Sequence, residues 1–352
     1  MKKGSVIHRF PGSNTTEGFY PLYKEGLRDM ARVFILKGGP GTGKSTLMKK
    51  IAGNLTERGY DVEMWQCSSD NESVDGVIVR ALQIAVVDGT APHTVDPVYP
   101  GAVDEIINLG DHWNREMLAE SREDIVRLTE EISENFQQAY EMLAEYKVLY
   151  DDFAMENSVG EKRITSLAND VICDVFGYDL SEIKHFFASA VTPNGWVGYN
   201  QELSADVRRR FVIKSANRYD VHLFLRQIED AAVLRGHDID IYHSTFAPDC
   251  YEMIVLPRIG FAFVDGSAPD LRSLPQDQTV EISAVQAADS QRRQKLEQAV
   301  NYIAKAKSLH NDLEDYYVKA MNFDEIDEVC KKVFAEIWQM ADEWEKSKES
   351  KQ

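Results

Sequence analysis

Short apolar runs along the chain alternate with amphipathic stretches. The run at 33–36 precedes a glycine-rich segment, and apolar residues then recur at helical spacing over 44–52. A second strand is expected at 61–65 and an apolar run lies at 84–87, whereas the run at 77–79 is too short to assign to an element. Strands that alternate with helices predict a parallel sheet covered on both faces, which is the α/β class.

The chain contains two copies of this pattern. Segments that begin at one position recur 177 positions later without a gap: Arg32–Lys37 as Arg209–Lys214, Arg58–Val62 as Arg235–Ile239, and Ala85–Pro92 as Ala262–Pro269. A common register over this length indicates a tandem duplication. We therefore expect two α/β repeats, at 1–182 and 183–352.

Each repeat is expected to end in long helices. Apolar residues recur mostly at three- and four-residue steps between Leu118 and Tyr146, and a returning helix carries Ile164, Leu167, Val171 and Val175. This spacing predicts an antiparallel helical hairpin at about 113–180, and a second one at about 288–348. The apolar stripes have two possible roles. They pack the helices against each other, or they form a surface that binds a partner or closes over a site.

The glycine-rich segment after the first strand carries the clearest chemistry. It matches G-x-x-x-x-G-K-S, in which backbone N–H groups surround a phosphate chain, the lysine reaches the β- and γ-phosphates and the serine binds Mg²⁺. The N-terminus of the following helix attracts the same anion. The predicted nucleotide-binding residues are Gly38, Gly39, Pro40, Gly41, Thr42, Gly43, Lys44, Ser45 and Thr46.

A second acidic position completes the predicted magnesium site. Asp88 directly follows the apolar run at 84–87. An aspartate at the end of such a strand can hold Mg²⁺ directly or through water. Ser45 and Asp88 are therefore the predicted metal ligands, and Lys44 and Asp88 the predicted catalytic residues.

The residue that positions the attacking water is less directly indicated. Many motor-type ATPases place a glutamate after the aspartate, but this chain has Gly89. His93 and Asp70 are the remaining candidates, because an imidazole or a carboxylate can accept a proton.

The second repeat has lost the features of a phosphate loop. Val221 stands at the position of Lys44, and Asp220 places a carboxylate where the first repeat has a glycine. We expect this repeat to bind no nucleotide in the usual mode and to act structurally or as a regulator. Pairing of the repeats could bring Arg218 or Arg258 to the γ-phosphate, a role that arginines fill in other enzymes.

Composition narrows the choice of partners. The 352 residues include 39 Lys and Arg against 58 Asp and Glu, a formal charge of −19 at pH 7, which disfavours broad binding to nucleic acid or anionic lipid. Four scattered cysteines form no C-x-x-C pair and fit a reducing compartment. No apolar stretch approaches the ~20 residues of a membrane span. We expect a cytoplasmic protein.

The phosphate loop together with Val87–His93 resembles a family of duplicated bacterial P-loop ATPase-like proteins. The likeness extends from about residue 6 to the C-terminal helices. Members of that family often keep the loop in both copies, and this chain departs from the pattern in its second copy. The resemblance implies a nucleoside-triphosphate-binding protein of the P-loop NTPase fold, and it implies no particular substrate beyond the nucleotide.

The sequence thus predicts a Mg²⁺-dependent ATP-binding protein that acts as an ATPase. Two alternatives stay open: a nucleotide sensor or scaffold without turnover, which works through its helical arms at 113–180 and 288–348, or a phosphotransferase with an acceptor near Cys67–Asp70. ATP is favoured over GTP because the chain has no N-K-x-D guanine motif. A protein partner is expected at the helical arms, and no nucleic acid or membrane partner is expected.

Overall fold

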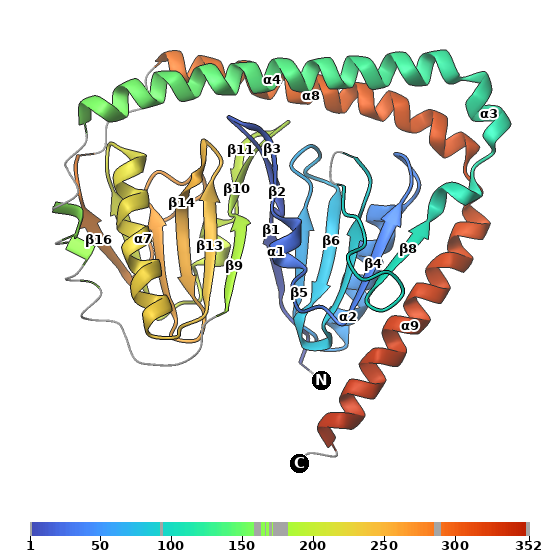
Figure 1. The fold of residues 1–352 in the computed structure, drawn as a ribbon, viewed down its shortest axis with the longest axis horizontal. Helices are drawn as coiled ribbons and strands as arrows, with labels where there is room; N and C mark the ends of the chain where they lie inside the picture. The colour runs from blue at the N-terminus through green and yellow to red at the C-terminus, as the bar shows by residue number, and fades with distance from the viewer. Residues whose placement is uncertain are drawn as a thin grey trace. The chain divides into compact units, whose positions relative to one another are not determined.

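The computed structural model describes residues 2–91, 94–157, 163–165, 167–168, 171, 182–284 and 290–349 (Figure 1). The chain forms two compact units. Unit 1 consists of Met1–His8, Leu27–Asn135 and Lys305–Gln352, and unit 2 of Arg9–Gly26 and Phe136–Ala304. These units do not coincide with the repeats at 1–182 and 183–352, because each unit includes segments of both repeats.

Unit 1 contains a six-stranded mixed sheet with the strand order β1-β5-β6-β7-β4-β8. Its strands are β1 (Val6–Arg9), β4 (Arg32–Lys37), β5 (Val62–Gln66), β6 (Val74–Val79), β7 (Ile84–Asp88) and β8 (Asp104–Asn108). β4 runs parallel to β7 and β8, whereas β6 is antiparallel to β5 and β7. The α/β class is confirmed, but the expectation of a purely parallel sheet was wrong. The run at 77–79 belongs to the antiparallel strand β6.

Two helices cover one face of this sheet. They are α2 (Lys44–Glu57) and α9 (Phe323–Glu349), and Figure 1 shows α9 in red beside β4 and β8. Their apolar residues share one core with alternate residues of the strands, such as Phe34 and Leu36 of β4. The shorter elements are η1 (Arg80–Leu82), η2 (Leu109–His112) and α3 (Arg115–Glu120). The first repeat therefore needs the last helix of the second repeat to close its core.

The sequence of α9 explains why it binds here. Val333, Ile337 and Ala341 are spaced by four residues, so they lie on one face of the helix, and all three are buried. Burial of the Val and Ile side chains stabilises the unit by on the order of 3–6 kcal/mol. Near the end of α9, the hydroxyl of Tyr60 donates to Glu345 at 2.6 Å.

Unit 2 repeats the topology of unit 1, with the strand order β16-β12-β15-β14-β13-β9. Its strands are β9 (Ile183–Phe187), β12 (Arg209–Lys214), β13 (Ile239–Ser244), β14 (Ala247–Leu256), β15 (Phe261–Asp265) and β16 (Asp277–Glu281). β14 is antiparallel to both of its neighbours, as β6 is, and β12 is parallel to β15 and β16. The shared strand order agrees with the duplication that the sequence predicts.

Helix α7 (Arg218–Leu234) packs on the sheet of unit 2, and α6 (Asn200–Leu203) is a single turn. Ile164 and Ala168, near the end of the first repeat, are fully buried in the same core. These residues belong to the predicted returning helix, of which Val175 lies outside the described residues. The last helical segments of the two repeats are therefore exchanged between the units.

The helical hairpin expected at about 288–348 is not formed, whereas the returning helix of the hairpin expected at about 113–180 lies largely outside the described residues. The two long helices are α4 (Arg122–Asn157) and α8 (Ser290–Ala320). In unit 2 they pack on each other, with Leu143 and Ile303 in one cluster and Lys295 paired with Glu145. α9 packs on the sheet instead of returning along α8. None of the helices in the described ranges is both long and apolar enough to cross a membrane.

Two β-hairpins in unit 2 join equivalent parts of the repeats. They are β2 (Gly12–Thr15) with β3 (Gly18–Pro21), which leads into α1 (Tyr23–Gly26), and β10 (Ser189–Thr192) with β11 (Gly195–Gly198). Phe10 forms an antiparallel bridge with Phe187, and the Asn14 amide donates to the Val191 carbonyl at 3.1 Å. The residues of each pair are 177 positions apart and are therefore equivalent in the two repeats. The two segments run antiparallel at the Phe10–Phe187 bridge, as they would around a local two-fold axis.

Replacement of Ile337 by alanine tests the packing of α9. The side chain is fully buried, so Ile337→Ala should lower the free energy of unfolding by about 2–5 kcal/mol. Lys332→Ala, at an exposed position of the same helix, should change it by less than about 0.5 kcal/mol. Denaturant titration measures both values. Equal stability of the two variants would show that α9 does not close this core.

Candidate functional site

The segment between β4 and α2 has the backbone geometry of an anion-binding loop. Gly41 and Gly43 have φ angles of 71° and 87°, in the left-handed region that favours glycine. α2 begins at Lys44, and no side chain caps its first turn. The first N–H groups of a helix need acceptors, and a bound anion can supply them.

Lys44 is turned back into the loop. Its ammonium group donates to the carbonyl oxygens of Gly38 and Gly39, both at 2.8 Å. The Asp88 carboxylate lies 3.6 Å from the same ammonium group, and only 9% of Lys44 is exposed. The two residues that the sequence predicts as catalytic are therefore brought together beside the loop.

Asp88 holds a turn as well as facing Lys44. Its Oδ1 atom accepts the backbone N–H of Thr90 at 2.8 Å, while Oδ2 is the atom nearest to Lys44. The Thr90 hydroxyl in turn donates to the Gly38 carbonyl at 2.8 Å. These hydrogen bonds fix the carboxylate relative to the loop. The Oδ2 atom faces the Lys44 ammonium group and remains available to a cation.

Ser45 links the loop to strand β6. Its hydroxyl oxygen accepts the Val74 N–H at 3.1 Å, and one lone pair of the oxygen remains for a metal ion. Thr42 is buried and donates to the Gly39 carbonyl at 2.9 Å, which braces the loop from inside. Thr46 is exposed on the first turn of α2.

These residues fit a nucleotide phosphate with Mg²⁺. The loop offers uncapped N–H groups and a buried ammonium group to the phosphates, and Ser45 and Asp88 offer oxygen atoms to the metal ion. Within the described part of the chain, no group of three His, Cys, Asp or Glu side chains forms a separate metal site. Mg²⁺ is often held by only one or two protein oxygens together with phosphate oxygens and water.

His93 and Asp70 are the two residues that the sequence offers for positioning the attacking water. His93 lies outside the described residues. The Lys37 ammonium group donates to the carbonyls of Gly89 and Val95, at 2.7 and 3.0 Å, and so holds the chain on either side of His93. Asp70 lies near the loop, but its carboxylate is paired with Lys307 of α8 at 2.7 Å.

Sequence reasoning missed that α8 covers the phosphate loop. A Cβ atom added to Gly39 would lie 2.8 Å from the ring of Tyr317, and one added to Gly41 would lie 2.8 Å from a side-chain carbon of Glu314. Trp113, next to α3, lies against the Tyr317 ring with 5.3 Å between centroids. Polar residues recur at helical spacing in α8 and indicate a polar face on this helix. The sequence does not indicate which part of the structure that face contacts.

The equivalent segment of unit 2 is a different structure. α7 begins at Arg218, three residues earlier than α2 in the common register, so helix replaces the glycine loop. The side chain of Asn217 caps this helix by accepting the Tyr219 N–H at 2.9 Å. Val221 is buried in the core, and Asp220 is also buried. The features that suit an anion in unit 1 are therefore absent here.

Arg218 fills the position beside the second aspartate. It is buried, donates to the Ser244 hydroxyl at 2.6 Å and lies 5.2 Å from the ring centre of Phe246. Burial alone would lower the pKa of Arg218, but the carboxylate of Asp265 and further groups outweigh it and raise the pKa. Arg258 pairs with Asp238 at 2.7 Å. Both candidate arginines thus have partners within unit 2.

The turns around the lost loop are retained. Asp265 accepts the Ser267 N–H at 2.8 Å, as Asp88 accepts that of Thr90. His222, at the position of Ser45, accepts the Tyr251 N–H at 3.2 Å, which repeats the link between Ser45 and Val74. These contacts have a structural role that survives without nucleotide chemistry, and this explains why the Asp-Gly-Ser-Ala-Pro sequence persists.

Glu252 adds a buried acid next to Arg218. It is 1% exposed and accepts a hydrogen bond from the Ser189 hydroxyl at 3.0 Å. Burial raises the pKa of Glu252 to about 7, although the charge of Arg218 acts in the opposite direction. The carboxyl group is therefore partly protonated near neutral pH.

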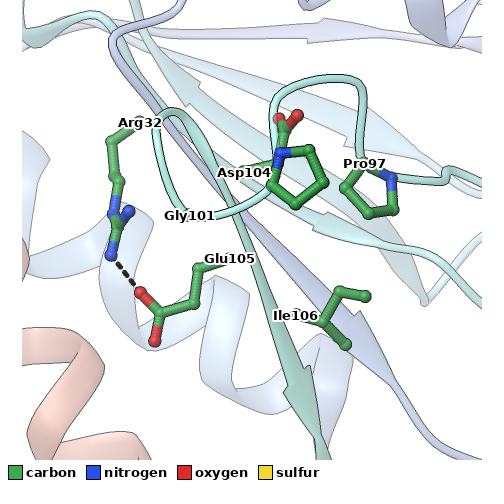
Figure 2. A pocket seen from close by; sticks show the side chains of 7 residues that line it. Arg32, Pro97, Gly101, Asp104, Glu105 and Ile106 are labelled. Atoms are coloured by element: carbon green, nitrogen blue, oxygen red, sulfur yellow. Dashed lines mark hydrogen bonds and ion pairs between the residues drawn. The ribbon is translucent and has the colours of Figure 1, made fainter.

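A surface hollow in unit 1 lies away from the loop. Figure 2 shows it at the start of β4 and β8, where Arg32 pairs with Glu105 and the side chains of Pro97 and Ile106 line the wall. The phosphate loop follows the opposite end of β4. Ligands of open α/β sheets bind at the carboxyl ends of the parallel strands, so this hollow is not a candidate nucleotide site.

The chain matches no protein-family model, no curated protein and no solved structure.

The buried acid of unit 2 predicts a pH dependence of stability. Because the native pKa of about 7 exceeds the ordinary value of 4.5, the native state keeps a proton that the unfolded chain releases between these pH values. The contribution of Glu252 to the free energy of unfolding should therefore be largest below pH 4.5, and it should be lost as the pH rises to about 7.

Glu252→Gln, which stays neutral, should remove this dependence. Its free energy of unfolding relative to the unchanged protein should rise between pH 5 and pH 8, as followed by urea titration. The same difference at both pH values would contradict the assignment.

Proposed function

We propose that the chain binds Mg-ATP at residues 38–46 and hydrolyses it, with a second repeat that binds no nucleotide. The observation that carries the proposal is the loop itself: left-handed Gly41 and Gly43, an uncapped helix start, and a buried Lys44 beside Asp88. A helix N-terminus, a nearby ammonium group and two oxygen ligands together suit a phosphate chain with its metal ion.

Each residue has a defined part in this proposal. Lys44 leaves the Gly38 and Gly39 carbonyls to contact the β- and γ-phosphates, and the N–H groups of the loop hold the β-phosphate. Ser45 and Asp88 would hold the metal ion, which would supply positive charge against the negative charge that develops on the phosphates. Thr90 keeps Asp88 in place through the turn.

A nucleotide sensor without turnover is the second candidate. It is favoured by the direct contact of Glu314 and Tyr317 of α8 with Gly41 and Gly39, since occupancy of the loop then affects the position of α8. The phosphotransferase gains no support, because Asp70 is paired with Lys307 and Cys67 is buried. We further propose a reducing compartment such as the cytoplasm, in which free thiols persist.

Replacement of Lys44 tests the site. Lys44→Ala removes the cation that contacts the phosphates, so affinity for Mg-ATP should fall on the order of 10- to 100-fold. Lys50→Ala, an exposed lysine of the same helix, is the matched control and should bind as before. Isothermal titration calorimetry measures both. Equal affinity of the two variants would refute the assigned loop.

The number of nucleotides bound tests the asymmetry of the repeats. Calorimetry on the full chain should give one Mg-ATP per chain, because Arg218 and Asn217 occupy the second position. Two sites of similar affinity would contradict the account of unit 2. Phosphate release in the same samples separates an ATPase from a sensor, which binds without turnover.

A further inference from the structure

One face of α8 brings four titratable side chains to the phosphate loop. Lys307, His310, Glu314 and Tyr317 are separated by three or four residues, so they form one stripe along the helix. Contacts at both ends of this stripe place it on unit 1: Lys307 pairs with Asp70, and Tyr317 lies against Gly39. α8 belongs to the second repeat, whereas the loop belongs to the first.

Lys307 lies near the start of α2. Its ammonium group is 2.7 Å from Asp70 Oδ1. The segment that carries Asp70 is tied to the first turns of α2, since Lys49 donates to the Glu72 carbonyl and the Val74 N–H donates to Ser45. Lys307 therefore reaches the side of the loop at which Ser45 would hold a metal ion and the terminal phosphate.

His310 lies between the same charged groups. His310 is an exposed residue of α8. Loss of nearby water lowers the pKa of its imidazole; Glu314 and Asp70 act to raise the pKa, and Lys44 and Lys307 to lower it. His310 follows Lys307 by three residues, so the two side chains lie on the same face of α8. A neutral imidazole can donate one N–H to a phosphate oxygen.

We propose that α8 supplies the contacts to the γ-phosphate: Lys307 exchanges Asp70 for a γ-phosphate oxygen, and His310 donates to a second oxygen. The site then distinguishes triphosphates from diphosphates through residues of the other repeat. This rests on the proposed nucleotide function. Glu314 takes no part as a ligand, because its carboxylate repels phosphate. The contact replaces the role that the sequence offered to Arg218 or Arg258.

The test compares affinities for ADP and for a non-hydrolysable ATP analogue, both with Mg²⁺. Lys307→Ala should weaken binding of the analogue about 10- to 100-fold and that of ADP less than about threefold, because only the γ-phosphate loses a charged hydrogen bond. His310→Ala should act in the same direction, by about 3- to 10-fold. Lys307→Arg should restore most of the selectivity. Lys305→Ala, an exposed lysine on α8, is the matched control.

A second variant gives an opposite expectation. Asp70→Asn removes the carboxylate that competes for Lys307, so it should tighten binding of the analogue and leave ADP unchanged. Equal weakening of both nucleotides by Lys307→Ala, or no weakening, would overturn the proposal. If Lys44→Ala still weakens binding of Mg-ATP by about 10- to 100-fold in that case, the proposed function stands. Failure of the unchanged protein to bind either nucleotide would overturn both.

Discussion

The burial of α9 against the sheet of unit 1 is the contact on which the rest of the structure depends. The sheet comes from the first repeat, yet its core includes Val333 and Ile337 of the second. At the end of the first repeat, Ile164 and Ala168 enter the core of unit 2 in the same way. Neither core is complete with the residues of one repeat. The duplicated sequence therefore folds as one interdependent chain.

This exchange also determines what surrounds the phosphate loop. Because α9 must reach the sheet of unit 1, the helix before it, α8, ends in the same unit and passes over the loop. Tyr317 and Glu314 then contact Gly39 and Gly41, and Lys307 meets Asp70. The chain connection thus brings the glycine loop of one repeat into contact with a helix of the other. The second repeat contributes to the candidate site without a loop of its own.

Unit 2 has a different structure at the position that the glycine loop occupies in unit 1. An extra helical turn capped by Asn217 takes the place of the glycine loop, and Arg218 supplies a cation beside Asp265. The buried aspartate needs a positive partner, because an unpaired charge is costly in the interior. The turn at Asp265 and the link from His222 to Tyr251 remain. These contacts show which parts of the motif support the fold.

Local features were predictable from the sequence, and long-range ones were not. The loop, the strand that ends in Asp88 and the duplication follow from motif and register. The hairpin at about 288–348 was wrong because periodicity shows that α8 and α9 are amphipathic but not which surface covers each. The antiparallel β6 was missed because Val77–Val79 is short. Lys307 was missed for the same reason as α9, since its contact spans more than 200 positions in the sequence.

The central claim is that one repeat holds a nucleotide and that α8 of the other repeat completes its site. A crystal structure with Mg²⁺ and a non-hydrolysable ATP analogue tests it most directly. The account predicts phosphate density within residues 38–45, with Lys307 at hydrogen-bond distance from the γ-phosphate, and none at residues 215–222. An empty first loop under saturating nucleotide, or a nucleotide held by the second repeat, would contradict it.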